Sequence, residues 1–350
     1  MEPIPVAILG ATGAVGQRFV QLLDHHPWFK VTTLCASDRS VGKTYVEGCR
    51  WLLDSPMPEW ARDMILQPTV LEAVNEPIVF SALPAEVAQD LEPALAEKGC
   101  VVCSNASAHR MDEDVPLLLP EVNAEHVELI HQQRQRRGWR GAIVTNPNCT
   151  STGMTIVLKA LDQVFGVKRA IAVSLQALSG AGYPGVASLD IVDNVIPFIR
   201  GEEEKVSLEP RKMLGTLKNG HIEYHPLTIS AQTNRVAVLD GHMVCLNVEC
   251  ETRPSPEEAI QVLEAFALPD WLANLPSSPR PPIMVRREND RPQPRLDRMT
   301  GRGMSTIVGR VRADEVLDLK MVVLSHNTIR GAAGASIYNA ELIVQKGLLP

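Results

Sequence analysis

One cysteine of this chain stands where a thiol could act as a nucleophile. Cys149 lies in the stretch TNPNCTSTG, after an Asn-Pro-Asn turn and at the start of a helical pattern of small hydroxylated residues. The dipole at the N-terminus of a helix lowers the pKa of a thiol there, and free N–H groups of the first turn can hold an oxyanion. We therefore predict that Cys149 is a nucleophile with a depressed pKa.

The other six cysteines carry no such indication. The stretch CVVC at 100–103 lies in a strand pattern rather than at a helix start, so a redox pair is not expected there. Free cysteines are mostly small buried residues. We expect this of Cys35, Cys49, Cys100, Cys103, Cys245 and Cys250.

A thiol nucleophile needs a group that moves protons, and one histidine has a suitable position. His242 follows RVAVLDG, on a glycine turn between two predicted strands, where a side chain can point into a cleft. It is therefore the candidate general acid/base. His221 and His225 have i, i+4 spacing, but HIEYH alternates as a strand does, so no metal site is predicted.

A glycine-rich turn near the N-terminus predicts a dinucleotide. Gly10, Gly13 and Gly16 in GATGAVG follow an apolar strand pattern and open a helix. Their missing side chains allow the backbone to turn tightly and to approach a pyrophosphate at the helix N-terminus. Beside a thiol, the nicotinamide of such a cofactor suggests hydride transfer to or from an acyl thioester.

The end of the second predicted strand, ASDRSVGK, bears on which dinucleotide binds. Asp38 could accept from the ribose 2′-hydroxyl of NAD. The hydrogen-bond donors and positive charge around it fit a 2′-phosphate better, so NADP is favoured over NAD. These donors are Ser37, Arg39, Ser40 and Lys43.

Strand and helix patterns alternate over the first 145 residues, which is typical of a doubly wound parallel sheet. Beyond residue 150, longer alternating stretches predict a second, antiparallel or mixed sheet. We expect an α/β fold: a Rossmann-type domain over 1–148 and an α+β domain over 149–327. The proline- and arginine-rich stretch 275–298 is expected to be an extended arm lying on the protein or on a second subunit.

The composition of the chain limits the kinds of partner and compartment that we expect. The chain of 350 residues has a net charge of -7, which argues against binding to nucleic acid or to anionic membranes. We see no signal peptide and no run of about 20 apolar residues that could cross a bilayer. An odd number of cysteines, seven, in a long chain favours a reducing cytoplasm over a disulfide scaffold.

Seven segments in order give the chain a resemblance over nearly its whole length. They are GATGAVG, SNASAHRM, TNPNCTS, QALSGAGYPG, EEEK, RVAVLDGH and HNTIRGAAGAS. With them the chain resembles aspartate-β-semialdehyde dehydrogenases, most closely the branch found in archaea, fungi and some bacteria. The resemblance implies reversible, NADP-dependent reduction of L-4-aspartyl phosphate to L-aspartate 4-semialdehyde, a step toward diaminopimelate, lysine, threonine, methionine and isoleucine.

The same resemblance implies a role for individual residues. Cys149 matches the nucleophile, His242 the acid/base and Gln176 the residue that orients the acyl group. The substrate ligands would be Arg235 for the α-carboxylate, Glu202 (or Glu203, since the run EEE leaves the register open) for the ammonium, and Lys205 and Arg110 for the phosphate. The cofactor contacts would be Gly10, Thr12, Gly13, Ala14, Val15, Gly16, Ser37, Arg39, Ser40, Ser81, Ser179, Gly180 and Asn327.

Three alternatives remain at this stage. A malonyl-CoA or succinyl-CoA reductase of the same fold would share the thiol, the histidine and the NADP site, but we expect it to lack Glu202 and Lys205. An N-acetyl-glutamyl-phosphate reductase would have no substrate ammonium to bind. A non-catalytic NADP-binding sensor would need neither Cys149 nor His242. The family resemblance also implies that the C-terminal helix 328–350 completes the first domain and that 149–327 is the catalytic and dimerisation domain. It implies a homodimer or homotetramer, without deciding between them.

Overall fold

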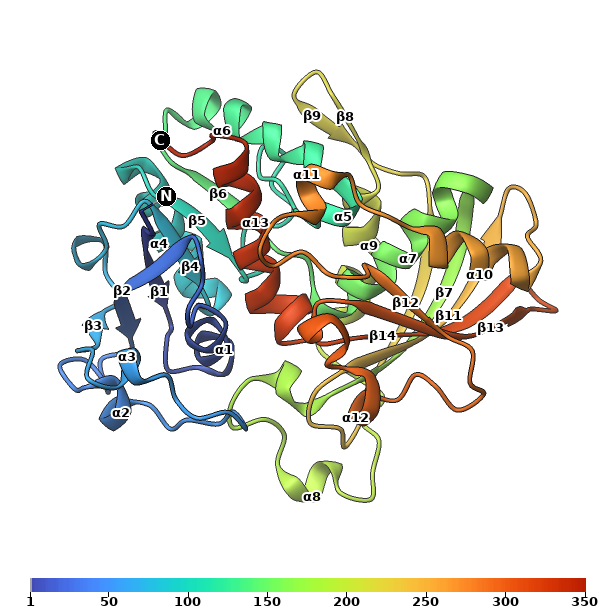
Figure 1. The fold of residues 1–350 in the computed structure, drawn as a ribbon, viewed down its shortest axis with the longest axis horizontal. Coiled ribbons are helices and arrows are strands. Elements are labelled where there is room, and N and C mark those ends of the chain that lie inside the picture. The colour runs from blue at the N-terminus through green and yellow to red at the C-terminus, as the bar shows by residue number, and fades with distance from the viewer. Residues whose placement is uncertain (1) are drawn as a thin grey trace.

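The fold was obtained as a computed structural model, which describes residues 2–350. A parallel sheet forms one side of the molecule (Figure 1), with the strand order β3-β2-β1-β4-β5-β6. Every pairing in this sheet is parallel, as the alternation of strands and helices predicted. Its strands are β1 (Ile4–Leu9), β2 (Phe29–Ala36), β3 (Gln67–Pro68), β4 (Ile78–Ser81), β5 (Val101–Ser104) and β6 (Ala142–Thr145).

The helices between these strands end where the sequence indicates. Gly99 closes α4 with a φ of +118°, and Gly138 closes the arginine-rich α6 with a φ of +68°. Both values lie in the left-handed region, which glycine enters without steric cost. The helical segments are α1 (Ala14–Leu22), α2 (Tyr45–Gly48), α3 (Glu59–Arg62), η1 (Leu71–Ala73), α4 (Ala85–Lys98), α5 (Pro120–Asn123), η2 (Ala124–Glu128) and α6 (Leu129–Arg137).

The C-terminal helix returns to this first sheet. A π-helical turn, η5 (Ile329–Ala333), leads into α13 (Gly334–Gln345), which runs down the middle of the molecule (Figure 1). Ile337 and Leu342 of α13 belong to the same buried cluster as Val6 of β1. The residues from Gly334 to Ile343 are all buried, because the small side chains of this helix let it pack closely on every side.

A second, mixed sheet follows the strand order β10-β7-β11-β14-β13-β12. β10 with β7, and β12 with β13, are parallel pairs, while the other neighbours are antiparallel. The strands are β7 (Val167–Gln176), β10 (Thr228–Arg235), β11 (His242–Cys250), β12 (Ile283–Arg286), β13 (Thr306–Ala313) and β14 (Leu319–Ser325). The fold class is therefore the predicted one, although sequence patterns did not reveal β13 and β14.

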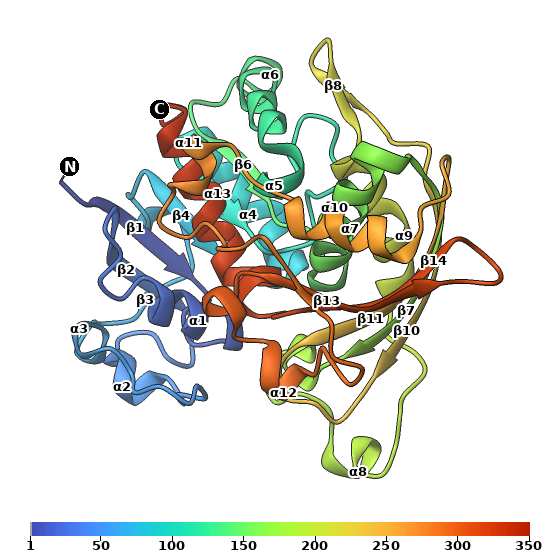
Figure 2. The ribbon, with the colours of Figure 1, turned by 45° about the vertical axis from the view of Figure 1, so that its right-hand side comes forward.

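Helices α7 (Cys149–Phe165), α9 (Glu202–Met213) and α10 (Pro256–Ala265) lie together beside this sheet (Figure 2). Met154 and Leu161 of α7 pack in one buried cluster with Leu246 of β11. Ser255 caps α10 through a capping box with Glu258, which fixes where this helix starts. The remaining short elements are η3 (Leu178–Ala181), α8 (Ser188–Ile191), β8 (Thr216–Lys218), β9 (His221–Glu223), α11 (Asp270–Ala273), α12 (Pro294–Asp297) and η4 (Thr300–Gly303).

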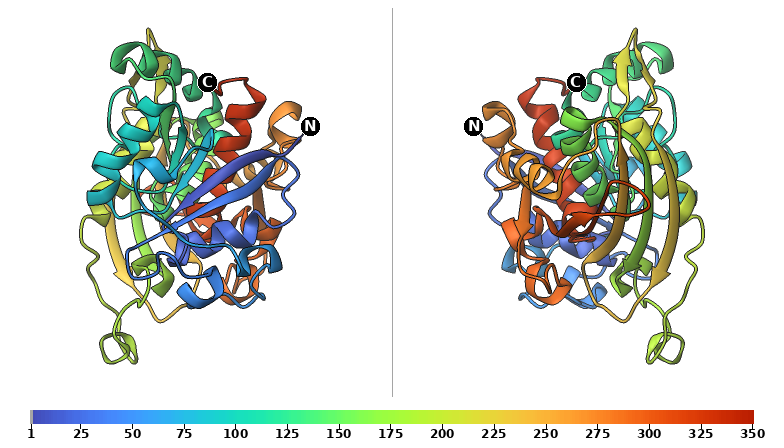
Figure 3. Two further views of the ribbon diagram at one scale, coloured as in Figure 1. Left: turned by 90° about the vertical axis from the view of Figure 1, so that its left-hand side faces the viewer. Right: turned by 90° about the vertical axis from the view of Figure 1, so that its right-hand side faces the viewer.

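The opposite face of the mixed sheet points outward. β7 and β10 run along the outer side of the molecule in the right-hand view of Figure 3. Exposed and buried residues alternate along β7 and β11, and Ile171 is 40% exposed. Cys245 is also exposed on β11, so the expectation that it is a packed thiol is wrong. The other five of these six cysteines are buried as expected.

The arm at 275–298 is more ordered than expected. It lies on the protein as predicted, but it contains β12, which pairs with β13, and the single turn α12. Arg286 and Arg291 both pair with Asp297, whose side chain is fully buried. The arginines of the arm are thus partly neutralised within the chain itself. Among residues 2–350, no helix is both long enough and apolar enough to cross a membrane.

Candidate active site

The ends of three neighbouring strands bring separate parts of the chain together. β7 ends at Gln176 and β10 ends at Arg235, and these two residues are directly paired in the parallel register. β11 runs antiparallel to β7 and begins at His242, so its first residue lies beside the last residues of β7. Helix α7 begins at Cys149 and packs against the same sheet.

Cys149 is the first residue of α7, as predicted. Asn148 caps the helix: its side-chain oxygen accepts from the N–H groups of Thr150 (2.9 Å) and Ser151 (3.4 Å). These two N–H groups are therefore not free to hold an oxyanion, and the N–H of Cys149 is the one of this turn that has no partner among the described residues. Gly331 of η5 lies close behind the cysteine, where an added Cβ would come within 2.7 Å of the Cβ of Cys149.

The thiol of Cys149 does not have the depressed pKa that its place at a helix start suggests. Burial raises the pKa to about 12, and the carboxylates of Glu202 and Glu209 add to this, while Arg110 and Arg235 oppose it. The cost of burying a thiolate therefore outweighs the effects of the helix N-terminus and of the two arginines.

Glu202 stands at the centre of a polar cluster. Its carboxylate accepts from the Asn148 side-chain amide at 3.0 and 2.8 Å and from Gln176 at 3.3 Å, and it pairs with Lys205 at 3.2 Å. Glu203 is exposed and accepts instead from the backbone N–H of Thr233, on β10. Of the two glutamates, only Glu202 has these contacts next to Cys149.

Arg110 reaches the site from the loop after β5. Its Nη1 pairs with Glu209 at 2.9 Å and its Nη2 donates to the backbone oxygen of Asn105 at 2.8 Å. The Nε of Arg110 is buried and has no hydrogen-bond partner among the described residues. Glu209 also accepts from the backbone N–H of Asn148.

Arg235 and His242 meet at Gly180. Arg235 is buried, and its Nη1 donates to the backbone oxygen of Ala177 at 2.7 Å. The backbone N–H of Ala177 donates to Nδ1 of His242 at 3.0 Å, so the neutral ring carries its proton on Nε2. A Cβ added at Gly180 would lie 3.0 Å from both Nη1 of Arg235 and Nε2 of His242.

His242 is held neutral. Burial lowers its pKa to about 3, with further contributions from Arg235 and His326. Its Nε2 is buried and has no partner within residues 2–350. The neutral ring therefore presents one N–H into the site, which can donate a hydrogen bond to a ligand.

The glycine turn fits a pyrophosphate. Gly10 has a φ of +71°, and a Cβ on Gly16 would lie 2.2 Å from the backbone oxygen of Gly10, so a side chain at either position would disturb the turn. Gly13 precedes the first helical residue, Ala14, and no side chain caps the helix. The N–H groups of this first turn are available to an anionic ligand.

The other predicted cofactor contacts lie near this turn or between the two domains. Ser37 and Arg39 are exposed at the end of β2, and Ser81 is buried at the end of β4. Asn327 donates to the hydroxyl of Ser179 at 2.7 Å, which places these two residues side by side. A cavity of about 270 Å³ opens beside them.

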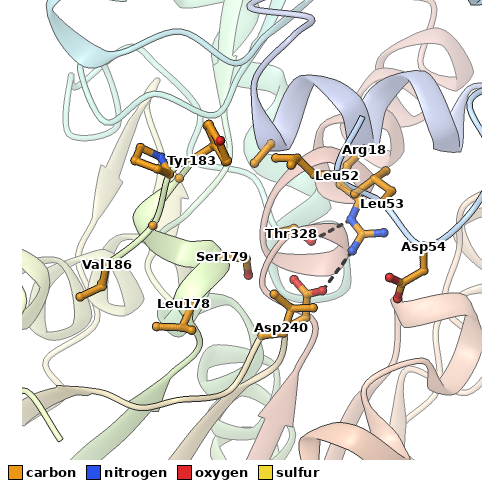
Figure 4. Close-up of a pocket in the computed structure, with 15 residues that line it drawn as sticks. Arg18, Leu52, Leu53, Asp54, Leu178, Ser179, Tyr183, Val186, Asp240 and Thr328 are labelled. Atoms are coloured by element: carbon orange, nitrogen blue, oxygen red, sulfur yellow. Dashed lines mark hydrogen bonds and ion pairs between the residues drawn. The ribbon is translucent and has the colours of Figure 1, made fainter. Parts of the chain in front are cut away.

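Figure 4 shows this cavity, where the first domain meets the second. Arg18 of α1 extends across it to Asp240 at 3.2 Å and to the hydroxyl of Thr328 at 3.0 Å. Ala14 of the glycine turn and Ser179 both line the cavity, so it connects the predicted pyrophosphate and nicotinamide regions. Among residues 2–350, no group of three or more His, Cys, Asp or Glu side chains is placed to hold a metal ion.

Sequence reasoning missed Asn148, Glu209 and Lys212, whose roles depend on folding. Asn148 was noted only as part of the turn before Cys149, and its amide contact with Glu202 joins segments that are distant in the sequence. The signal for Glu209 and Lys212 was their spacing from Glu202 and Lys205, which continues one helix face.

Two family models match the chain. A semialdehyde dehydrogenase NAD-binding domain matches residues 5–130, and a semialdehyde dehydrogenase dimerisation domain matches residues 158–330. Aspartate-semialdehyde dehydrogenase of Archaeoglobus fulgidus is 52% identical over 344 residues, covering 98% of this chain and 99% of the relative. That of Schizosaccharomyces pombe is 45% identical over 353 residues, covering 98% of this chain and 99% of the relative.

Solved structures that resemble this chain are also aspartate semialdehyde dehydrogenases. Aspartate semialdehyde dehydrogenase from Candida albicans, solved with NADP, matches with a TM-score of 0.90 at 40% identity and covers 99% of this chain and 100% of its own. Aspartate semialdehyde dehydrogenase II from Vibrio cholerae, complexed with ASA, matches with a TM-score of 0.78 at 27% identity and covers 99% of both chains.

Proposed function

Because the chain belongs to the aspartate-semialdehyde dehydrogenase family, it converts L-4-aspartyl phosphate and NADPH to L-aspartate 4-semialdehyde and phosphate, reversibly, and we propose that Cys149 is the nucleophile. The observation that carries this assignment is the convergence of Cys149, Glu202, Arg110, Arg235 and His242 from five separate segments.

Substrate binding is assigned by charge. The guanidinium of Arg235 would hold the α-carboxylate, and the carboxylate of Glu202 would hold the ammonium. Glu202 is preferred to Glu203 because it contacts the residue before Cys149. Arg110, with its unpaired Nε, and Lys205 would bind the phosphate.

The proposed reaction passes through a thioester on Cys149. The Cys149 sulfur would attack the acyl carbon as the thiol proton passes to the departing phosphate, which leaves as hydrogen phosphate, with Gln176 orienting the acyl group. Bound NADPH would supply the hydride that reduces the resulting thioester, and the carbon–sulfur bond would then break to release the aldehyde and return the thiolate, which regains a proton from solvent. The Nε2–H of His242 would donate a hydrogen bond to the acyl oxygen in both steps.

The cofactor would lie along the uncapped start of α1. The backbone of Gly10, Thr12, Gly13, Ala14, Val15 and Gly16 would bind the pyrophosphate. Ser37, Arg39 and Ser40 would bind the 2′-phosphate, with Ser81 further along the cleft. Ser179, Gly180 and Asn327 would contact the nicotinamide half, which the hydrogen bond between Asn327 and Ser179 supports.

We further propose that 1–148 with 328–350 forms the cofactor domain and that 149–327 forms the catalytic and dimerisation domain of a cytoplasmic homodimer or homotetramer. The outward face of the mixed sheet supports this assembly. It presents Ile171 and Cys245 beside half-buried Val173, Leu175 and Met243, an apolar patch suited to a second copy. In sedimentation experiments, Ile171→Asp should dissociate the assembly, whereas Val316→Asp, at a position 80% exposed, should not.

A substrate comparison tests the proposed function. The purified protein should reduce NADP when given aspartate semialdehyde and phosphate, with turnover that depends on phosphate. It should not oxidise NADPH with malonyl-CoA or succinyl-CoA at a comparable kcat/KM. Preference for a CoA thioester would overturn the assignment and favour the related reductases.

A further inference from the structure

Helix α9 carries four charged side chains on one face. Glu202, Lys205, Glu209 and Lys212 are spaced by three, four and three residues, which places them along one stripe of the helix. Glu202 and Lys205 face the substrate site. Glu209 and Lys212 are 2% and 1% exposed, and neither has a part in the reaction described above.

Glu209 joins two parts of the site. One carboxylate oxygen pairs with Nη1 of Arg110 at 2.9 Å, and the other accepts from the backbone N–H of Asn148. A single buried carboxylate therefore links the guanidinium of Arg110 to the peptide immediately before Cys149.

Lys212 holds the backbone of the loop that carries Arg110. Its ammonium donates to the backbone oxygens of Arg110 at 2.8 Å, Asp112 at 2.7 Å and Val115 at 2.9 Å. All three N–H donors are thus used on one loop. Burial lowers the pKa of Lys212 to about 8, opposed by Asp112, Asp114 and Glu209. Burying the ammonium of Lys212 costs free energy, but its three hydrogen bonds fix the position of the loop.

The result is that Arg110 has little freedom. Its Nη1 and Nη2 are taken by Glu209 and by the backbone oxygen of Asn105, and its own carbonyl is held by Lys212. Only Nε is left without a partner among the described residues. The side chain is oriented before any ligand arrives.

We propose that Glu209 and Lys212 are positioning residues that fix Arg110 relative to Lys205 and Cys149. This inference rests on the proposed function, in which Arg110 and Lys205 bind the phosphate. Lys205 is part of α9, and Arg110 is fastened to α9 by Glu209 and Lys212. One rigid helix therefore sets the spacing of the two phosphate ligands, and this preorganisation favours the phosphate step.

Lys98 provides a matched control. At the end of α4 its ammonium also donates to a neighbouring loop, namely to the backbone oxygens of Leu71 at 3.0 Å and Val74 at 2.6 Å and to the side chain of Asn75 at 3.0 Å. That loop carries none of the proposed ligands. Lys98→Met should therefore cost stability without changing any KM.

The test is the steady-state oxidation of aspartate semialdehyde with phosphate and NADP. Lys212→Met should raise the KM for phosphate about 10-fold or more, because a small displacement of a binding group has a large effect. The KM values for NADP and for the semialdehyde should stay within about twofold of wild type, since the groups that bind them are untouched. A merely structural role would not single out phosphate.

Glu209→Gln is the second variant, and it decides the matter if Lys212→Met does not fold. It keeps the volume and the acceptor for the N–H of Asn148 but removes the charge that faces Arg110. Electrostatics alone predicts tighter phosphate binding when a nearby anion is removed. The positioning role predicts weaker binding, again about 10-fold.

The outcomes distinguish a failure of the proposed function from a failure of the positioning role of Glu209 and Lys212. A wild-type protein without phosphate-dependent turnover would overturn the proposed function itself. An active wild type, with a phosphate KM in Glu209→Gln and in any folded Lys212→Met no higher than in Lys98→Met, would overturn the positioning role alone.

Discussion

Two helices of the molecule begin at functional strand ends, and they begin differently. Helix α1 follows β1 through Gly13, and no side chain caps its first turn. Helix α7 follows β6 through Asn148, whose side chain accepts from Thr150 and Ser151. An uncapped start leaves the N–H groups of the first turn for an anionic ligand, whereas the cap on α7 takes up two of them.

The difference decides which groups recognise the ligand. At α1 the backbone itself can bind a pyrophosphate, and the requirement on sequence is the absence of side chains. At α7 the cap takes up two N–H groups, and in the proposed function the charged parts of the substrate bind side chains such as Arg110, Lys205 and Arg235. The site around α7 is buried, and burial raises the pKa of Cys149 to about 12.

The substitution with the largest expected effect on the α7 site alone is Cys149→Ser. The substitution removes the nucleophile at α7 and leaves α1 unchanged, so turnover should fall by at least about 10³-fold. NADP affinity, measured by fluorescence titration, should stay within a few-fold of wild type. Turnover above about a tenth of wild type would remove Cys149 from the mechanism.

Arg235→Lys tests whether recognition at α7 depends on side-chain geometry. Lysine keeps the charge but loses the paired donors of the guanidinium, so kcat/KM for aspartate semialdehyde should fall about 10²-fold, or about 2.7 kcal/mol. The KM for NADP is the internal control and should not change. An unchanged kcat/KM would place Arg235 outside the substrate pocket.

Gly13→Asp would give α1 a capped start like that of α7. Gly13 has φ −75° and ψ 169°, and the nearest atom to an added Cβ, the backbone oxygen of Gly10, lies at 3.4 Å, so the change can be accommodated. The carboxylate should cap the helix and repel the pyrophosphate, raising the Kd for NADP about 30-fold, or about 2 kcal/mol. The melting temperature should be equal or higher. NADP binding of wild-type strength would show that this helix start is not the pyrophosphate site.

Arg39→Ala addresses what the backbone at α1 cannot do, which is to distinguish NADP from NAD. Loss of one charged hydrogen bond to the 2′-phosphate should weaken NADPH by about 1.5 kcal/mol, or somewhat more than 10-fold. The affinity for NADH should remain nearly the same. Equal losses for both cofactors would assign Arg39 another role.

A final expected effect concerns the pH dependence of stability rather than ligand binding. Because the pKa of His242 is lowered to about 3 in the folded protein, the unfolded chain binds a proton between about pH 6.5 and 3 that the folded chain excludes. Stability is therefore lost as the pH falls through this range. Between pH 7 and 5, His242→Gln should lose less unfolding free energy than wild type, by up to about 2 kcal/mol. The control is His131→Gln, at a side chain that is 58% exposed. Its unfolding free energy, measured by urea denaturation, should equal that of wild type at pH 7 and at pH 5.

Local patterns in the sequence were sufficient to predict the conformation of the α1 start, but not the surroundings of the α7 start. The glycine turn acts through its backbone, so residue types and spacing at 10–16 predict both its conformation and its ligand. The parallel sheet followed from the alternation of strands and helices for the same reason. By contrast, β13 and β14 were not recognised, and Cys245 was expected to be buried, because burial of a strand face depends on which elements pack against it.

The surroundings of Cys149 could be predicted only in part. The position at a helix start was visible, but the pKa depends on Glu202, Glu209, Arg110 and Arg235, which converge from distant segments. Their individual roles came from resemblance to a family. No spacing rule indicated that Glu209 accepts from the peptide before the cysteine.

The placement of α13 has a consequence for the order of events during synthesis. The first domain is built from the start of the chain, yet Ile337, Leu342 and Ile343 supply part of its core. A nascent chain that has reached residue 330 lacks these side chains, so the apolar surface they cover stays open. The core around the first sheet therefore cannot be completed until α13 has been made, after the segment that forms the second sheet.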